Sequence, residues 1–180
     1  MRIGLISDTH IPVAMPELWP QVYEAFRGVD LIMHGGDLLV TEVLDWLAEI
    51  APVLAVEGNG DYTGFERSIP PTDPRLSEAK VLSHASGLRI GLVHDFQMPE
   101  HPPLRTMEGQ MRHFFGGPVD VIVRGSTHRA EITTVKGVLI VCPGSPTFPN
   151  HANTRLGSVG FLDIDDSGNV EASILDLADV

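Results

Sequence analysis

The sequence contains one cysteine, Cys142, among 180 residues. A single cysteine permits no internal disulfide and excludes a zinc site built from several thiolates. Because Cys142 ends the apolar run VLIVC, we predict that it is a small buried side chain in a strand and not a reactive thiol. A metal site in this chain would therefore depend on oxygen and imidazole donors.

Long apolar segments are also missing. No run approaches the roughly 20 apolar residues that a membrane-spanning helix needs. The chain passes from Met1 directly into a short strand-like run, without the apolar core of a signal peptide. We therefore expect a cytoplasmic protein that has no membrane partner.

Positive charge is scarce, with 12 Lys and Arg residues against 24 Asp and Glu residues and a formal net charge of −12. Such a surface repels polyanions, so nucleic acid is not expected as a general partner. The content of 43% hydrophobic and 20% charged residues is that of an ordinary globular protein. We expect a single domain over residues 1–180, since this length fits one hydrophobic core.

The first third of the chain alternates between strand-like and helical patterns. The strand-like runs are nearly continuous apolar stretches, which is typical of buried parallel strands. The helical segments repeat apolar residues at the helical period, and Thr41 is a candidate N-cap for the second of them. This order predicts a parallel sheet with right-handed crossovers. The strands are expected over residues 2–7, 30–34 and 52–56, and the helices over 18–26 and 42–50.

The remainder of the chain favours hairpins and one further helix. The sequence then predicts an α/β fold in which helices cover the outside of two packed sheets. A hairpin is expected over residues 79–85 and 88–94, a helix over 104–115, a buried strand over 119–124, and hairpin turns at 136–137 and 166–169.

Five strand-like runs each end beside a residue that can bind a metal ion. In open α/β sheets, ligands bind just beyond the carboxyl ends of the strands, so these side chains are expected to converge although they are far apart in sequence. Oxygen and imidazole donors without sulfur suit Mn²⁺, Fe, Zn²⁺ or Co²⁺. The candidate ligands are Asp8, His10, Asp37, Asn59, His94 and His128.

Each candidate is weak when taken alone, because a DxH pair, a GGD turn or a lone histidine also fits an ordinary turn or a hydrogen-bonded polar residue. Asp8 and His10 are two residues apart, so an extended backbone would point both the same way. Asp37 has two carboxylate oxygens and could bridge two ions. His34 could hydrogen-bond to a ligand without binding the ion itself. The remaining histidines are interpreted as surface or packing residues: His84, His101, His113 and His151.

Six short motifs resemble, in order, those of the calcineurin-like metallophosphoesterases, and of their small prokaryotic phosphodiesterase branch in particular. They are SDTH at 7–10, HGGD at 34–37, GN at 58–59, VH at 93–94, GSTH at 125–128 and PGS at 143–145. The resemblance implies a four-layer α/β/β/α sandwich of two mixed sheets flanked by helices. It also implies a hydrolase that acts on phosphoester bonds, in particular a phosphodiesterase with a metal-activated water at a dinuclear site.

The same resemblance implies which residues hold the two ions. The first ion would be bound by Asp8, His10, Asp37 and His128. The second ion would be bound by the catalytic residues Asp37, Asn59 and His94, with Asp37 as the bridge. The implied cofactors are two divalent ions, with Mn²⁺ expected and Fe, Zn²⁺, Co²⁺ or Ni²⁺ as alternatives. The implied partner is a small phosphoester substrate.

Three positions depart from the family pattern. Ser126 stands where a histidine for the second ion is expected, and Asp95-Phe96 replaces a glycine and a second histidine. The second site is therefore one donor short and expected to bind its ion weakly, unless Asp95 compensates. Gly60 stands where relatives carry a histidine or cysteine near the leaving group, so no side chain there can donate a proton. This predicts slow turnover or a preference for good leaving groups, as in a phosphodiester or an activated aryl phosphate.

These departures keep a second interpretation open, namely a catalytically weakened or inactive binding or scaffold protein, like the retromer-subunit relatives of the family. A TIM-barrel metallohydrolase is disfavoured because such a barrel takes about 250 residues. The glycine motifs of nucleotide-binding folds are absent. Loops 61–78 and 95–103 are expected to frame the substrate pocket, while the physiological substrate and the oligomeric state stay open.

Overall fold

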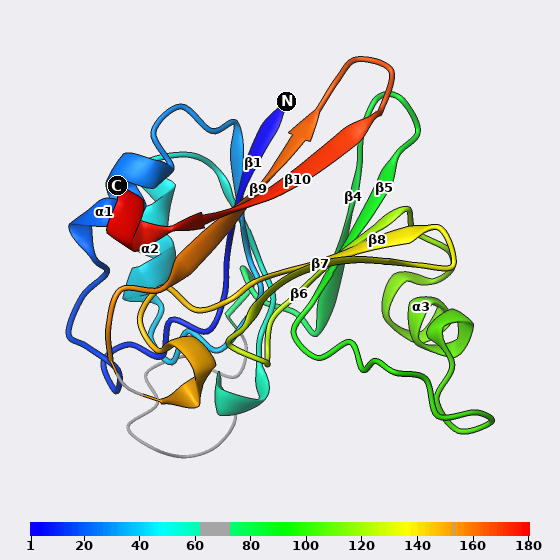
Figure 1. Ribbon diagram of the computed structural model, residues 1–180, viewed down its shortest axis with the longest axis horizontal. Coiled ribbons are helices and arrows are strands. Elements are labelled where there is room, and N and C mark those ends of the chain that lie inside the picture. Colours follow the sequence, from blue (N-terminus) through cyan, green and yellow to red (C-terminus); the bar gives the residue numbers. More distant parts are fainter. Residues whose placement is uncertain (62–72, 153) are drawn as a thin grey trace.

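The first of two five-stranded sheets contains β1 (Arg2–Ile6), β2 (Leu31–His34), β3 (Val53–Ala55), β9 (Ser158–Ile164) and β10 (Val170–Asp176). This is a computed structural model that describes residues 1–61, 73–152 and 154–180 (Figure 1). The strand order is β10-β9-β1-β2-β3, in which β1, β2 and β3 run parallel. β9 pairs antiparallel with both β1 and β10, so the sheet is mixed.

The second sheet contains β4 (Ala79–Ser83), β5 (Arg89–Val93), β6 (Val121–Arg124), β7 (Ala130–Val135) and β8 (Val138–Pro143). Its order is β4-β5-β6-β8-β7. The three central strands run parallel, and β4 and β7 close the edges as antiparallel partners of β5 and β8. The predicted strands and both predicted hairpin turns are confirmed, with strand ends up to two residues shorter than expected.

Each sheet packs one face against the other sheet and the opposite face against helices. Along β1, Ile3 and Leu5 belong to the core between the sheets, whereas Ile6 packs with the helices, as the two-residue period of a strand requires. The predicted four-layer α/β/β/α sandwich is confirmed. Helices α1 (Pro20–Ala25) and α2 (Glu42–Ala48) cover the first sheet, and α3 (Met107–Phe115) covers the second (Figure 1).

Helix α3 begins later than the predicted residue 104. Residues 101–105 form a small turn instead, in which His101 and Arg105 exchange two backbone hydrogen bonds. The side chain of Thr106 then accepts the Gly109 N–H at 3.0 Å as an N-cap, which starts the helix at Met107. Thr41 occupies the N-cap position of α2 as predicted, but its side chain makes no capping hydrogen bond.

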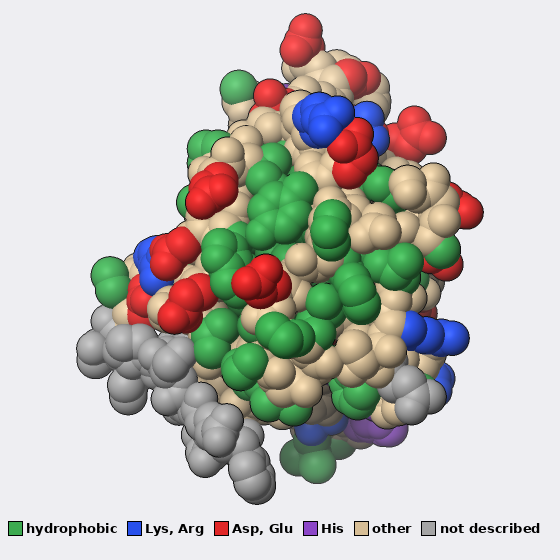
Figure 2. Space-filling model, turned by 90° about the vertical axis from the view of Figure 1, so that its left-hand side faces the viewer, with side chains coloured by type: hydrophobic (Ala, Val, Ile, Leu, Met, Phe, Trp, Pro, Cys, Tyr) green, Lys and Arg blue, Asp and Glu red, His purple; other side chains and the backbone are tan. Residues whose placement is uncertain are grey.

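The outer surface over α1 and α2 keeps a partly apolar character. Figure 2 shows hydrophobic side chains gathered on this face, with carboxylates between and around them. Trp19, Tyr23 and Trp46 are half-buried there against the core. Within the described ranges, no helix has the length and apolar character needed to cross a membrane. Cys142 is fully buried in β8, as predicted.

Candidate metal centre

Four of the predicted ligands meet beyond the carboxyl ends of β1, β2 and β6. The possible ligand atoms of Asp8, His10, Asp37 and His128 all lie within 4.8 Å of one another, and we call these residues the first cluster. His10 Nε2 is 3.1 Å from His128 Nε2 and 3.4 Å from Asp37 Oδ2. His128 Nε2 is 3.3 Å from Asp8 Oδ1. The fold thus joins His10 and His128, which are 118 positions apart.

The two remaining predicted ligands lie on the other side of Asp37. His94 Nε2 is 3.5 Å from Asp37 Oδ1 and 3.1 Å from the side-chain oxygen of Asn59. Asn59 begins the 3₁₀ turn η1 (Asn59–Asp61), and His94 directly follows β5. We call Asp37, Asn59 and His94 the second cluster. The two oxygens of Asp37 therefore face different groups, Oδ2 toward the first cluster and Oδ1 toward His94.

Backbone carbonyls determine which imidazole nitrogen faces the clusters. His128 Nδ1 donates to Phe148 O at 2.7 Å, and His94 Nδ1 donates to Gly35 O at 2.7 Å, because a carbonyl can only accept. These bonds orient Nε2 of each ring toward its cluster, where a ring that carries its proton on Nδ1 can bind an ion. Burial lowers the pKa of His128 to about 4 and also lowers the pKa of His10, so both rings are neutral near pH 7.

The clusters bring possible ligand atoms within a few ångströms of one another. The Nε2 atoms of His128 and His94 lie 3.3 and 3.5 Å from carboxylate oxygens of Asp8 and Asp37. Asp8 Oδ2 is buried and has no hydrogen-bond partner in the described part of the chain. Burial also raises the pKa of Asp8 to about 7, because its ionised form has lost water. A divalent cation would satisfy all these atoms, so the residues fit a metal site.

The backbone of the first cluster is left-handed. The φ angle is 57° at Asp8, 46° at His10, 58° at Asp37 and 55° at His128. The expectation that an extended backbone aligns Asp8 and His10 is wrong, because β1 ends at Ile6 and both residues lie in the turn beyond it. Left-handed backbone at a residue other than glycine costs on the order of 1–3 kcal/mol and is concentrated at functional sites. Tight turns after the strands therefore bring these side chains together.

Asp61 supports the site and was not identified from the sequence. Its buried carboxylate accepts backbone N–H groups from Asp37 at 3.0 Å, Leu39 at 2.8 Å and Gly58 at 2.8 Å. Burial raises the pKa of this carboxyl, and the N–H groups oppose the rise. Asp61 thereby ties the loop after β2 to the loop after β3. The only signal in the sequence was the run NGD, which is more often an ordinary turn.

Two glycines allow the backbone to approach Asp37. A Cβ atom at Gly58 would lie 2.1 Å from Asp37 Oδ1, and a Cβ atom at Gly60 would lie 3.0 Å from it. The Gly60 N–H donates to Asp37 Oδ1 at 2.7 Å. Gly60 therefore orients the carboxylate through its backbone, although it offers no side-chain acid.

Two further histidines adjoin the clusters. His34 is fully buried, accepts the Gly36 N–H on Nδ1 at 3.1 Å, and therefore donates from Nε2 to Thr9 Oγ1 at 3.3 Å. His151 was predicted to be a surface or packing residue. It is exposed, and its ring lies on that of His128 with the centroids 3.5 Å apart, so it packs at the rim of the first cluster.

The residues that depart from the family pattern have other contacts. Phe96 is fully buried and its ring stacks on Phe115 of α3, with an interplanar angle of 9°. Asp95 accepts a hydrogen bond from Gln97 Nε2 at 2.7 Å and does not belong to the group of clustered ligand atoms. Ser126 donates its backbone N–H to an oxygen of Asp8 at 3.1 Å. Phe96 therefore builds the core behind the site, and Asp95 is held by its neighbour.

The sequence profile of the calcineurin-like phosphoesterase superfamily domain matches residues 1–167. The chain belongs to this superfamily. A probable metallophosphoesterase of Methanocaldococcus jannaschii is 34% identical over 178 residues, which cover 97% of this chain and 81% of that protein. Another, from Methanothermobacter thermautotrophicus, is 36% identical over 152 residues, which cover 83% and 79%. The family predicted from the six motifs is therefore confirmed.

Solved structures agree with this assignment. Vps29 of Entamoeba histolytica in complex with zinc superposes with a TM-score of 0.67 at 25% identity, and the match covers 98% of this chain and 99% of that one. A novel archaeal phosphodiesterase superposes with a TM-score of 0.63 at 19% identity, covering 97% and 100%. At that identity the second likeness concerns the fold alone.

Proposed function

We propose that this protein is a metal-dependent phosphodiesterase that binds two divalent ions, with Mn²⁺ as the working ion. The observation that carries the proposal is the position of Asp37, whose oxygens lie 3.4 Å from His10 Nε2 and 3.5 Å from His94 Nε2. A carboxylate so placed could bind one ion with each of its oxygens. The first cluster would hold one ion and the second cluster the other.

Divalent ions in such a pair of sites lower the pKa of a water molecule and neutralise the charge of a phosphate group. The chain supplies a rigid frame for them, since His94 and His128 are oriented by backbone carbonyls and Asp37 by the Gly60 N–H. Asp8 is fully buried, whereas Asn59 is exposed and the His10 side chain is 20% exposed. Substrate would therefore reach the clusters from the side of Asn59 and His10.

The leaving group receives no proton from residue 60, because Gly60 has no side chain. General acid catalysis contributes about 10²–10⁴-fold in rate, so substrates whose leaving groups need no acid are favoured. A small phosphodiester or an activated aryl phosphate meets this condition better than an alkyl monoester. We extend the proposal to residues 1–180 as one metallophosphoesterase domain that acts in the cytoplasm, without a membrane or nucleic-acid partner.

Similar proteins support this proposal. Two archaeal relatives bear the name probable metallophosphoesterase, and one similar structure contains zinc. The donor set of carboxylates, imidazoles and one amide suits Mn²⁺ as well as Zn²⁺, Fe, Co²⁺ or Ni²⁺. Ser126 leaves the second cluster with fewer strong donors than the first, so the second ion is expected to bind more weakly.

The direct test uses bis(p-nitrophenyl) phosphate with purified protein that has been freed of metal and reloaded with Mn²⁺. Release of p-nitrophenol should depend on Mn²⁺ and should fall to background in the Asp37→Ala variant. Absence of Mn²⁺-dependent release, or equal release by wild type and Asp37→Ala, would overturn the proposed activity. Metal content measured on the same samples counts the ions.

A second candidate is a scaffold protein that keeps the fold and has lost catalysis. It is favoured by the hydroxyl of Ser126 in place of an imidazole, by Phe96 in the core and by Gly60. The two candidates differ in a clear way. A scaffold would bind metal with the first cluster yet release no p-nitrophenol at any metal concentration.

A further inference from the structure

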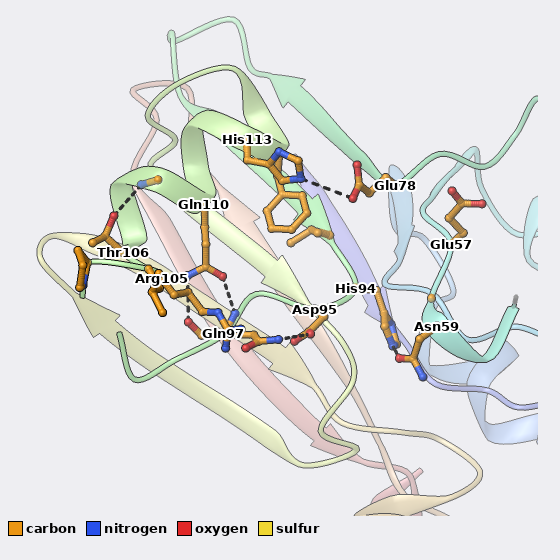
Figure 3. Close-up of a pocket in the computed structure, with 16 residues that line it drawn as sticks. Glu57, Asn59, Glu78, His94, Asp95, Gln97, Arg105, Thr106, Gln110 and His113 are labelled. Atoms are coloured by element: carbon orange, nitrogen blue, oxygen red, sulfur yellow. Dashed lines mark hydrogen bonds and ion pairs between the residues drawn. The ribbon is translucent and has the colours of Figure 1, made fainter. Parts of the chain in front are cut away.

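A cavity of about 980 Å³ opens directly beside the second cluster. Asn59 and His94 form part of its wall, and the opposite wall consists of residues 95–106 and one side of α3 (Figure 3). The volume is at the upper end of the range for small-molecule sites, about 300–1,000 Å³. A phosphoester held between the two clusters would therefore extend one of its substituents into this cavity. The predicted loop 95–103 does frame it, while residues 62–72 of the other predicted loop lie outside the described residues.

The charged groups of the cavity lining include more carboxylates than permanent cations, among the residues that the structure describes. Glu57, Glu78 and Asp95 are the carboxylates, Arg105 is the guanidinium, and His94 and His113 are the imidazoles. The His113 ring already lies 3.7 Å from a carboxylate oxygen of Glu78 (Figure 3). Among the described lining residues, three carboxylates therefore outnumber the one guanidinium, so a further anion would meet net negative charge.

Glu57 lies two positions before Asn59 of the second cluster. It is half-buried, and its backbone N–H donates to Ser77 O at 3.0 Å, which anchors the segment. Its carboxylate has no hydrogen-bond or ion-pair partner in the described part of the chain. An unpaired, partly desolvated carboxylate favours a hydrogen-bond donor or a cation from the ligand and disfavours a second anion.

The amides of the lining are already engaged. Gln97 N–H donates to Gln110 Oε1 at 2.9 Å, and Gln110 Nε2 donates to Gln97 O at 3.0 Å. Gln97 Nε2 donates to Asp95 at 2.7 Å (Figure 3). These bonds hold the 95–106 segment against α3 and keep the cavity open. Asp95 and Glu78 are thus paired with Gln97 and His113, which leaves Glu57 as the carboxylate without a partner among the described lining residues, and Phe114 adds an apolar surface to the cavity.

We propose that this cavity binds one ester substituent of the substrate, and that this substituent carries hydroxyl or amino groups and no second anionic group. The inference rests on the proposed phosphodiesterase function. It narrows the substrate class to diesters of one phosphate with a polyol-like or amine-bearing alcohol. Diesters that bear a further phosphate, sulfonate or carboxylate are selected against.

The test compares three symmetrical diesters: bis(3-hydroxypropyl) phosphate, bis(3-aminopropyl) phosphate and bis(3-sulfopropyl) phosphate. Because both substituents of each diester are identical, either one can enter the cavity without changing the comparison. Dissociation constants are measured by calorimetry on Mn²⁺-loaded protein. The hydroxyl and amino diesters should bind at least about tenfold more tightly than the sulfonate diester. Equal binding of all three would overturn the inference.

Two variants separate the cavity from the net charge of the protein. Glu57→Gln should reduce the ratio between the dissociation constants of the sulfonate diester and the other two diesters at least about threefold, since it removes one negative charge from the lining. Glu171→Gln removes the same charge from the exposed face of β10 and should leave the preference unchanged. If both variants change the preference alike, or neither does, the inference fails. Asp95→Asn provides a second variant of the lining in case Glu57→Gln does not fold.

Hydrolysis tests the proposed function, and the preference among the diesters tests the inference, so the two can fail independently. Hydrolysis of bis(p-nitrophenyl) phosphate with no preference among the three diesters would overturn only the inference. A clear preference without any metal-dependent hydrolysis would overturn only the phosphodiesterase activity.

Discussion

Asp61 Oδ2 accepts the backbone N–H of Asp37 at 3.0 Å, so one buried carboxylate positions another. The same oxygen accepts the Gly58 N–H, and Oδ1 accepts the Leu39 N–H. Three donors converge on a group that contributes no ligand atom to either cluster. The position of Asp37, on which both clusters depend, is therefore set by a residue from a different loop.

Replacing Asp61 with asparagine should destabilise the protein and weaken metal binding. The asparagine amide would turn an NH₂ group toward at least one N–H donor, and an unsatisfied buried group costs about 1–3 kcal/mol. Chemical denaturation of metal-free protein measures the loss, and calorimetry with Mn²⁺ should show at least about tenfold weaker affinity. Glu171→Gln is the control on the surface. Wild-type affinity in Asp61→Asn would contradict the positioning role.

Removing the charge of Asp8 should abolish stabilisation by metal. Binding to the folded state alone adds about 2.7 kcal/mol to the free energy of unfolding at a metal concentration of one hundred times Kd. Wild type should show an increase of this size with Mn²⁺, whereas Asp8→Asn should show almost none at the same concentration. Thermal unfolding with and without Mn²⁺ measures both. Equal stabilisation of the two proteins would show that Asp8 holds no ion.

The affinity for metal should depend on pH near neutrality. Burial raises the pKa of Asp8 to about 7, so the carboxyl must lose a proton before it can bind an ion. The ionised fraction is about tenfold lower at pH 6 than at pH 8, and the Mn²⁺ affinity should fall by the same factor. Calorimetry in buffers of different ionisation enthalpy should report close to one proton released per ion at pH 6 and almost none at pH 8. Equal proton release at both pH values would contradict this assignment.

His34 should make the stability of the metal-free protein depend on pH in the acid range. Burial lowers the pKa of His34 to about 3 from its ordinary value of 6.5, so the unfolded chain binds more protons than the folded protein between these values. The stability that His34 contributes should therefore be fully present above pH 6.5. As the pH decreases from 6.5 toward about 3, the free energy of unfolding should fall by up to about 1.4 kcal/mol per pH unit from this group.

The matched variant is His34→Asn, whose side-chain oxygen can still accept the Gly36 N–H. Asp8 acts in the opposite direction in the metal-free state, because its raised pKa makes the folded protein bind more protons below pH 7. Both proteins share that contribution, so the difference in slope between them isolates His34. Parallel stability curves from pH 4 to pH 7 would show that His34 does not titrate on unfolding.

Ser126→His should strengthen the second ion site. Ser126 has a φ of 73°, and histidine is among the residues that tolerate this left-handed region. An added imidazole supplies the donor that the second cluster lacks, so the weaker ion should bind about tenfold more tightly and the metal content should rise toward two ions per chain. Ser173→His on the exposed face of β10 is the control. Unchanged metal content in Ser126→His would show that the hydroxyl position does not face the second ion.

Local patterns in the sequence were sufficient to predict the strands to within two residues at their ends, and the residue types gathered beyond them. Apolar runs followed by Asp37, His94 and His128 gave the right strands, because a buried strand must be apolar and must end where polar side chains begin. The same patterns failed at the start of α3, which was predicted at residue 104. His101 pairs with Arg105 through the backbone, so residues 101–105 form a turn and the helix begins only at Met107. The patterns also failed for the turn at Asp8, because left-handed backbone is set by its surroundings and not by residue type.

The sequence by itself determined the family, the two mixed sheets and the set of oxygen and imidazole donors, since these depend on residue types and their order. Only the tertiary structure decided how the donors are shared. The division of the Asp37 oxygens between the clusters, the support from Asp61 and the contact of His151 with His128 each depend on backbone turns held by distant residues. Such contacts follow from distances of a few ångströms in space, which spacing along the chain does not encode.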